Sequence, residues 1–128
     1  IKIFVINNQG YHSIRQTQTN LFEKHFVGIG PESGDLSFPD MSRLAPAYGY
    51  PFFRCETNAQ LDETISKVLA VKGPAICEIM VSTEQKFEPK SATKRLEDGT
   101  LVSPPLEDLA PFLDRDEFYS NMIIKPIS

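Results

Sequence analysis

The sequence predicts an α/β protein with three layers, in which helices cover both faces of a parallel β-sheet. Three short apolar runs, at residues 1–6, 51–56 and 75–81, alternate with segments of helical periodicity. This alternation favours parallel strands joined by right-handed helical crossovers. The first run, IKIFVI, is interrupted only by Lys2, a pattern typical of a strand that is covered on both faces.

The segment between the first two strands contains two predicted helices and a loop. Residues 11–22 fit the first helix, because four side chains fall close to one face: Tyr11, Ile14, Gln18 and Phe22. The stretch GIGPESGD, residues 28–35, has the composition of a loop. The second helix follows Pro39 and ends at Gly49, with one stripe formed by Met41, Leu44, Ala45 and Tyr48.

The clearest helix signal lies in residues 57–72. Thr57 and Gln60 form a T-x-x-Q capping box, which satisfies backbone N–H groups at the start of a helix. Gly73 and Pro74 end the helix. The predicted buried stripe consists of Leu61, Ile65, Val68 and Leu69.

The character of the chain changes after Val81. Residues 82–105 are polar, and we expect them to be ordered but irregular. Residues 106–124 fit one or two short helices, with Pro111 as the break. The chain thus divides into residues 1–83, an α/β domain, and residues 84–128, a C-terminal tail with short helices.

Composition narrows the classes of protein and partner. The 128 residues carry a formal charge of −4, without the basic footprint usual for binding nucleic acid or anionic membranes. Cys55 and Cys77 lie in apolar runs without metal or redox spacing, so we expect two reduced, buried cysteines in a cytoplasmic protein. The chain begins at Ile1 inside an apolar run, and we therefore expect it to be the C-terminal part of a longer polypeptide.

Polar residues follow the first strand directly, in the stretch Asn7-Asn8-Gln9-Gly10. In open parallel sheets, ligands bind beyond the carboxyl ends of the strands. An asparagine oxygen is a hard, neutral ligand suited to Mg²⁺ or Ca²⁺, and a glycine lets a backbone carbonyl turn toward the same ion. By spacing alone, the stretch fits either a metal site or a simple polar turn.

The stretch FVINNQGYHSIRQTQ, residues 4–18, resembles the second half of the motif that binds thiamine diphosphate (ThDP). The similarity is to the acetolactate synthase-like group, in which the Asn-Asn pair is followed by a run ending in Gln-x-Gln, as in Gln16-Thr17-Gln18. It extends through PDMSRLAPAYG, residues 39–49, and through residues 57–81. The resemblance implies the ThDP-binding α/β fold.

The resemblance also implies roles for individual residues. The side chain of Asn8 and the backbone carbonyl of Gly10 correspond to ligands of Mg²⁺. Tyr11 and Ile14 correspond to positions that face the cofactor. Ser13 and Thr17 correspond to positions that line the substrate pocket.

The family needs two elements that these residues do not contain. The Gly-Asp-Gly half of the motif, with its own metal-binding aspartate, is expected before Ile1. The catalytic glutamate comes from another domain, normally of a neighbouring subunit. We therefore expect no catalytic residue in residues 1–128, no activity of this chain alone, and a homodimer or homotetramer of the whole enzyme. In the family the tail, here residues 84–128, can close over the active site as a lid.

The implied reaction is decarboxylation of a 2-oxo acid such as pyruvate and transfer of the two-carbon unit to an acceptor carbonyl. Family members that make branched-chain precursors carry tryptophan at the position of Thr17, and this chain has no tryptophan. The acceptor is therefore open, with a keto sugar among the candidates. A simple 2-oxo acid decarboxylase and a non-catalytic α/β domain that has lost the cofactor are the alternatives.

Other polar residues allow two interpretations each. His12 is either a proton shuttle or a hydrogen-bonded residue of the first helical turn. Arg15 either meets a substrate carboxylate or faces solvent. Glu32 and Asp35 fit solvated carboxylates of the loop, and His25 fits a structural role.

Overall fold

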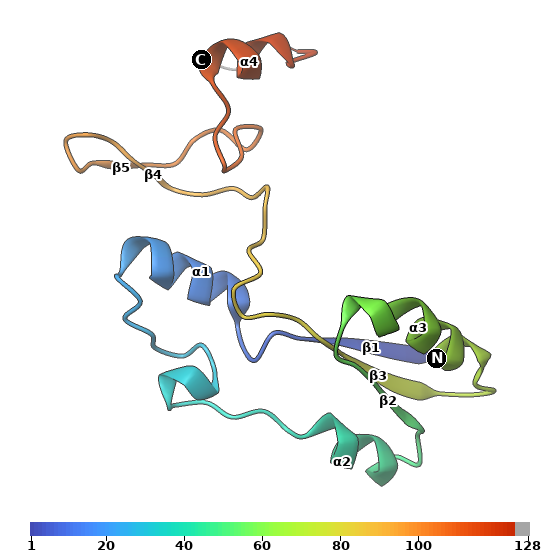
Figure 1. Cartoon of the computed structure of the whole chain (residues 1–128). Coiled ribbons are helices and arrows are strands. Elements are labelled where there is room, and N and C mark those ends of the chain that lie inside the picture. Colours follow the sequence, from blue (N-terminus) through green and yellow to red (C-terminus); the bar gives the residue numbers. More distant parts are fainter. Residues whose placement is uncertain (125–128) are drawn as a thin grey trace. The chain divides into compact units, whose positions relative to one another are not determined.

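Three strands pair in parallel in the N-terminal part of the chain. The computed structural model describes residues 1–124, which form two compact units: Ile1–Gln85, the N-terminal unit, and the segment from Lys86 onward, the C-terminal unit. The strands are β1 (Lys2–Asn7), β2 (Phe52–Cys55) and β3 (Ala75–Met80), in the order β1-β3-β2. The predicted parallel α/β arrangement is confirmed (Figure 1).

β1 differs from the prediction in its burial. Among the described residues it pairs only with β3, so it lies at an edge of the sheet. Ile3 and Phe4 are partly exposed, and Ile6 is 57% exposed. The expectation of a strand covered on both faces is therefore wrong for the described chain, because the helices at residues 41–47 and 61–70 pack mainly against the other two strands.

Helix α3 (Leu61–Ala70) covers one face of the sheet and builds the core. Val68 is fully buried against Ala75 and Cys77 of β3. Cys55 and Cys77 are both buried and unpaired with each other, as predicted, and burial raises the pKa of the Cys77 thiol.

The start of α3 follows the predicted capping chemistry. A short 3₁₀ turn, Asn58–Gln60, precedes the helix, and the side chain of Gln60 accepts hydrogen bonds from the backbone N–H groups of Glu56 and Thr57. Leu69 is 59% exposed, so its place in the predicted buried stripe is wrong. It lies directly after Val68, on the outward side of the same helix.

Helix α2 (Met41–Ala47) lies on the opposite face of the sheet (Figure 1). Asp40 caps it by accepting a hydrogen bond from the Ser42 N–H at 2.8 Å, and the Ser42 hydrogen bonds lower the pKa of Asp40. Gly49 ends the helix as predicted, in the left-handed conformation at φ 71°. Tyr48 is exposed, so it does not belong to the buried side of this helix, contrary to the predicted stripe.

Helix α1 (His12–Leu21) confirms the predicted helix, and the side that it buries is polar. The buried side chains are polar: His12, Arg15 and Gln16. The predicted apolar face, with Tyr11, Ile14 and Phe22, is exposed. Apolar periodicity alone cannot identify the buried face of a helix when polar groups have specific partners inside.

The C-terminal unit has little regular structure. A two-stranded antiparallel ribbon, β4 (Lys94–Arg95) and β5 (Leu101–Val102), was not predicted. Helix α4 (Arg115–Ser120) is the single α-helix of residues 106–124 and begins after Pro111. A two-pronged ion pair joins Arg115 to the buried Asp108 and lowers the pKa of that carboxyl. The role of this segment as a lid stays a prediction.

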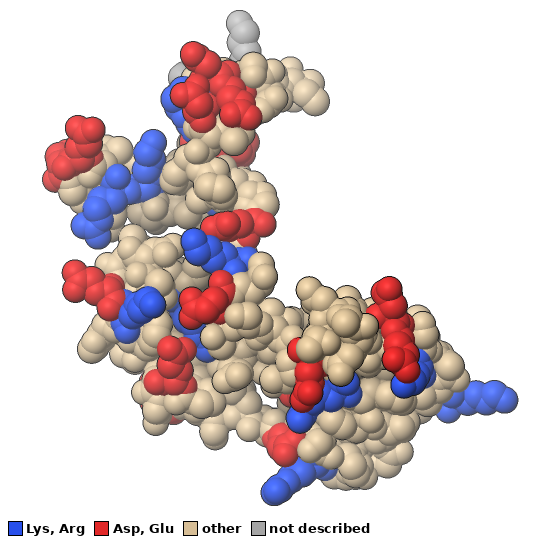
Figure 2. All heavy atoms as spheres, in the orientation of Figure 1, with Lys and Arg blue, Asp and Glu red and all other residues tan. Residues whose placement is uncertain are grey.

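Charged side chains of both signs are interspersed over the face of each unit that Figure 2 presents. No helix of residues 1–124 is both long and apolar enough to cross a membrane.

Candidate functional site

The polar stretch after β1 forms a tight turn at the carboxyl edge of the sheet. The Val81 N–H donates to the Asn7 carbonyl at 2.9 Å, which ties the turn to the end of β3. Gln9 has φ 58°, in the left-handed region that non-glycine residues seldom occupy. Such a conformation persists only where the surroundings stabilise it, and the contacts described below do so.

Gly10 is required by a close approach of the loop at residues 28–35. The Tyr11 N–H donates to the Ile29 carbonyl at 2.7 Å, and a Cβ atom on Gly10 would lie 2.0 Å from that same oxygen. A Cβ atom on Gly30 would in turn lie 2.6 Å from the Gln9 carbonyl. The two glycines therefore let two backbone segments touch, and Ile29 between them is fully buried.

Both ends of the Asn7 amide are engaged within the protein. Its Nδ2 donates to Oε1 of Glu78 at 2.6 Å, and its Oδ1 accepts from the Gln9 N–H at 2.9 Å. Glu78, on β3, is only 3% exposed and also accepts from Nε and Nη2 of Arg54 on β2, at 2.9 and 2.7 Å. This pairing raises the pKa of Arg54. Asn7 is thus a structural member of a buried polar network.

Asn8 differs from Asn7, because its side chain makes no hydrogen bond with residues 1–124. It is half-buried and lines a pocket of about 190 Å³ at the end of β1. The pocket is lined by residues of β1, the turn, the start of α2 and β3: Val5, Ile6, Asn7, Asn8, Gly10, Phe38, Pro39, Met41 and Glu78.

Arg15 lies beside the turn and contacts its backbone. Its Nη1 donates to the Asn8 carbonyl and its Nη2 to the Gln9 carbonyl, both at 3.0 Å. Its Nε forms an ion pair with Glu32 at 3.0 Å. Both predictions for Arg15 are therefore wrong: the side chain is 5% exposed, and its donors face groups of the protein.

His12 has partners on both ring nitrogens. Nδ1 lies 3.1 Å from Nη1 of Arg15, and Nε2 contacts the backbone carbonyl of Gln85. An arginine has no acceptor atom, so Nδ1 accepts and Nε2 carries the proton. This arrangement supports the structural interpretation of His12 over a proton shuttle.

The predicted ligand-facing side chains of α1 share its exposed side. Tyr11, directly before the helix, and Ser13, Ile14 and Thr17 within it are all exposed, whereas His12, Arg15 and Gln16 are buried. The Tyr11 ring meets Phe38 edge to face at 5.8 Å between centroids, and so lies next to the pocket that contains Asn8. The Thr17 hydroxyl donates to the Ser13 carbonyl at 3.1 Å. The structure thus groups these residues, while their roles toward a ligand stay predictions.

The loop carboxylates are bound rather than simply solvated. Glu32 pairs with Arg15, as described, and Asp35 accepts from the Gly28 N–H at 2.8 Å and from the Ser33 hydroxyl. These hydrogen bonds, that from Ser33 first, lower the pKa of Asp35. The loop is therefore fixed from inside, which holds Ile29 and Gly30 against the turn.

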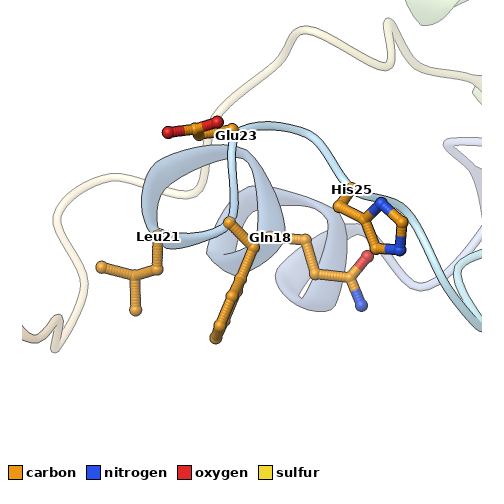
Figure 3. A pocket seen from close by; sticks show the side chains of 5 residues that line it. Gln18, Leu21, Glu23 and His25 are labelled. Carbon is orange, nitrogen blue, oxygen red and sulfur yellow. The ribbon is translucent and has the colours of Figure 1, made fainter.

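A second pocket, of about 520 Å³, lies at the end of α1 (Figure 3). Gln18 holds the chain after α1 against the helix. Its Nε2 donates to the Val27 carbonyl at 2.9 Å, and its Oε1 accepts from the Val27 N–H at 3.0 Å. His25 is exposed in this pocket, whose lining is Gln18, Leu21, Phe22, Glu23 and His25. Glu23 in this lining and the adjacent Lys24 also have positive φ, at 52° and 62°, but no glycine lines the pocket as Gly10 lines that of Asn8.

Sequence reasoning missed Glu78, Arg54, Phe38 and the contact of the loop with the turn. Glu78 stands in an apolar strand, and a carboxylate there is the signal that could have identified a buried ion pair. Arg54 and Phe38 gave no comparable signal. The spacing Gly28-Ile29-Gly30 indicated a loop but not its contact with the turn.

The turn offers oxygen ligands without a carboxylate cluster. Among the described residues, no group of three or more His, Cys, Asp or Glu side chains is arranged to hold a metal ion. An unengaged amide and backbone carbonyls fit Mg²⁺ only where a ligand such as a diphosphate supplies further oxygens. The arrangement therefore fits part of a metal–diphosphate site.

Residues 1–79 match the family described as thiamine pyrophosphate enzyme, C-terminal TPP binding domain. The chain belongs to this family, and thiamine pyrophosphate is another name for ThDP. The match begins with β1 and ends within β3, so it includes the turn and the loop beside it.

Particular relatives are acetolactate synthases. The chain is 30% identical over 92 residues to the acetolactate synthase large subunit of Cyanidium caldarium, covering 72% of this chain and 15% of the relative. It is 26% identical over 93 residues to the chloroplastic acetolactate synthase 2 of Zea mays, covering 70% of this chain and 14% of the relative. It is also 26% identical over 89 residues to the mitochondrial acetolactate synthase of Schizosaccharomyces pombe, covering 70% of this chain and 13% of the relative. The chain thus matches about one-seventh of the length of these relatives.

Proposed function

We propose that this chain supplies one part of a Mg²⁺–ThDP site in an enzyme that decarboxylates a 2-oxo acid such as pyruvate. The two-carbon unit would then be transferred to an acceptor carbonyl, in a homodimer or homotetramer. Membership of the ThDP family and similarity to acetolactate synthases support this proposal. A cytoplasmic location stays a prediction, since two relatives are named as chloroplastic and mitochondrial.

The division of labour between Asn7 and Asn8 is the observation that carries the proposal. Both residues line the pocket, but Asn7 uses both ends of its amide on Glu78 and Gln9, whereas the amide of Asn8 makes no hydrogen bond with residues 1–124. An amide oxygen that already accepts a hydrogen bond from the protein has one lone pair fewer for a cation than an amide oxygen without such a partner. Asn8 is therefore the metal ligand of the pair, and the Gly10 carbonyl is the second ligand from this chain.

The remaining residues bind and orient the cofactor and substrate. Tyr11 and Ile14 would face the cofactor, and the contact of Tyr11 with Phe38, which lines the same pocket as Asn8 and Gly10, supports this assignment. Ser13 and Thr17 lie on the same side of α1 and line the substrate pocket. When bound, ThDP supplies the carbanion chemistry that decarboxylation requires. The residues of this chain contribute binding, orientation and exclusion of water.

Replacement of each asparagine in the full-length protein tests the ligand assignment. We expect Asn8→Ala to weaken Mg²⁺-dependent ThDP binding at least about tenfold, which is about 1.4 kcal/mol. Asn7→Ala should affect binding less and stability more, because it leaves Glu78 without one of its donors. Isothermal titration of Mg²⁺–ThDP and chemical unfolding of each variant separate the two effects.

Equal losses of cofactor affinity in the two variants would contradict the assignment of Asn8. Absence of ThDP binding by the wild-type protein in saturating Mg²⁺ would contradict the cofactor proposal itself and favour a non-catalytic domain. Product analysis with pyruvate separates transfer of the two-carbon unit from simple decarboxylation, which would release an aldehyde.

A further inference from the structure

We propose that Arg15 is a positioning residue, which holds the Asn8-Gln9-Gly10 turn in the shape that presents its metal ligands. This inference rests on the proposed function of the turn and adds a residue outside the set expected to touch metal, cofactor or substrate. The side chain reaches the turn from α1, on a part of the helix that is buried.

The guanidinium group binds two successive carbonyls of the turn. Nη1 and Nη2 donate to the Asn8 and Gln9 oxygens at 3.0 Å each. Two parallel donors of one planar group fix the direction of both peptide planes at once. The carbonyls of Asn8 and Gln9 are thereby directed toward α1, and the next carbonyl, that of Gly10, remains for the proposed metal.

The turn needs such a support because its backbone is strained. Gln9 lies at φ 58°, and Gly10 packs so closely that a Cβ atom there would be 3.1 Å from Nη2 of Arg15. An unsupported non-glycine residue in this conformation returns readily to an ordinary one. Arg15 therefore stabilises both the position and the conformation of the turn.

Arg15 is itself held in place by the loop and by α1. Glu32 pairs with Nε at 3.0 Å, and Nδ1 of His12 lies 3.1 Å from Nη1. Four separate acceptors thus face one guanidinium group. Glu32 also balances the buried positive charge, since unpaired charges are costly in a protein interior.

Arg15 acts through the turn rather than on a ligand. The side chain is 5% exposed and does not line the pocket of Asn8 and Gly10. A group that bound a phosphate or substrate directly would need to reach that pocket. The expected consequence of its loss is weaker cofactor binding with little change in the chemistry of the loaded enzyme.

Three variants of the full-length protein test this role. Arg15→Met keeps the apolar stem and removes all donors, and Arg15→Lys keeps the charge but cannot span two carbonyls. We expect both to weaken Mg²⁺-dependent ThDP binding, by roughly 10- to 100-fold. Glu32→Gln alters a half-exposed carboxylate, and we expect it to weaken binding by about threefold, since Arg15 loses an anchor but keeps the turn. The matched control, Arg43→Met, removes an exposed arginine whose ion pair with Asp40 is 3.7 Å long, and should bind as wild type.

Two readouts distinguish positioning from a general loss of structure. The cofactor concentration for half-maximal rate should rise in Arg15→Lys, while kcat in saturating Mg²⁺–ThDP stays within about threefold of wild type. In the cofactor-free protein, hydrogen exchange should accelerate at the Gln9 and Tyr11 amides, which are bonded to Asn7 and Ile29, and not along β3.

The outcomes separate this proposal from the proposed function. If wild type binds Mg²⁺–ThDP and Arg15→Lys binds equally well, the positioning role is wrong and the cofactor site stands. Unchanged exchange at Gln9 and Tyr11 would also overturn it, whatever the cofactor result. If Arg15→Met does not fold, Arg15→Lys and Glu32→Gln decide, and wild-type affinity in both would reject the proposal. A wild type that ignores Mg²⁺–ThDP would reject the proposed function and this role together.

Discussion

Helices α1 and α3 have ten residues each and are both amphipathic, yet α3 buries an apolar side chain and α1 buries polar side chains. α3 buries Val68 against β3 and exposes its charged side chains, as a helix of an ordinary core does. α1 buries His12, Arg15 and Gln16 and leaves Tyr11 and Ile14 exposed. The difference indicates that α3 serves to build the sheet, whereas α1 serves to hold the turn and to present an apolar face beside it.

The largest effect on stability should come from the core side of α3. Val68→Ala removes two methyl groups from a fully buried position and should lower the free energy of unfolding by about 2 kcal/mol. Leu69→Ala on the same helix is the control, and we expect less than about 1 kcal/mol, since Leu69 is mostly exposed. Urea unfolding of the full-length variants, followed by hydrogen exchange along β3, measures the difference. Equal losses would show that burial does not distinguish the two positions.

The exposed face of α1 should be almost neutral for stability. Ile14 is exposed, and alanine is a better helix former than isoleucine. Ile14→Ala should therefore lower the free energy of unfolding by less than about 0.5 kcal/mol. ThDP affinity should fall instead, because Ile14 is proposed to face the cofactor. The two measurements are urea unfolding without cofactor and titration with Mg²⁺–ThDP. A stability loss as large as that of Val68→Ala would mean that the two helices are used alike.

The smallest effect should be the dependence of stability on pH that comes from Glu63 on α3. The hydrogen bond from Lys67, followed by its charge, lowers the pKa of Glu63 on the exposed side of α3. A carboxyl with a lowered folded pKa stabilises the folded state above its unfolded pKa of about 4.3, and this contribution is lost as the pH falls through the folded value. Glu63→Gln should therefore narrow the difference in stability between pH 7 and pH 3. In α1 the first turn has no acidic side chain and the last turn has no basic side chain, so the helix has no pair like Glu63 and Lys67. An unchanged pH profile would contradict the contribution of Glu63.

The sheet and its helices were predictable because they follow from periodicity and from end signals. The three strands, the cap at Gln60 and the stop at Gly49 all lie where local patterns place them. The orientation of α1 was not predictable, because Arg15 is buried by partners at Asn8, Gln9 and Glu32 that lie in other segments. Apolar periodicity contains no information on such contacts.

The candidate site was predictable only as a stretch of sequence. Asn8 and Gly10 were identified through a motif, and the structure adds the reason why Asn7 and Asn8 differ. The network of Asn7, Glu78 and Arg54 joins residues up to 71 positions apart in sequence. These residues meet because β1 and β2 both pair with β3. Long-range pairing of this kind follows from tertiary structure and not from any single segment.

The polar network under the turn has a consequence for how the sequence can change. Glu78 stands opposite Val5 of β1 and Arg54 of β2 in register, so its carboxylate links all three strands. Loss of the arginine alone would leave a buried charge without its cation, and loss of the glutamate alone would release Asn7. In related sequences, we therefore expect positions 7, 54 and 78 to be replaced together or to stay as they are.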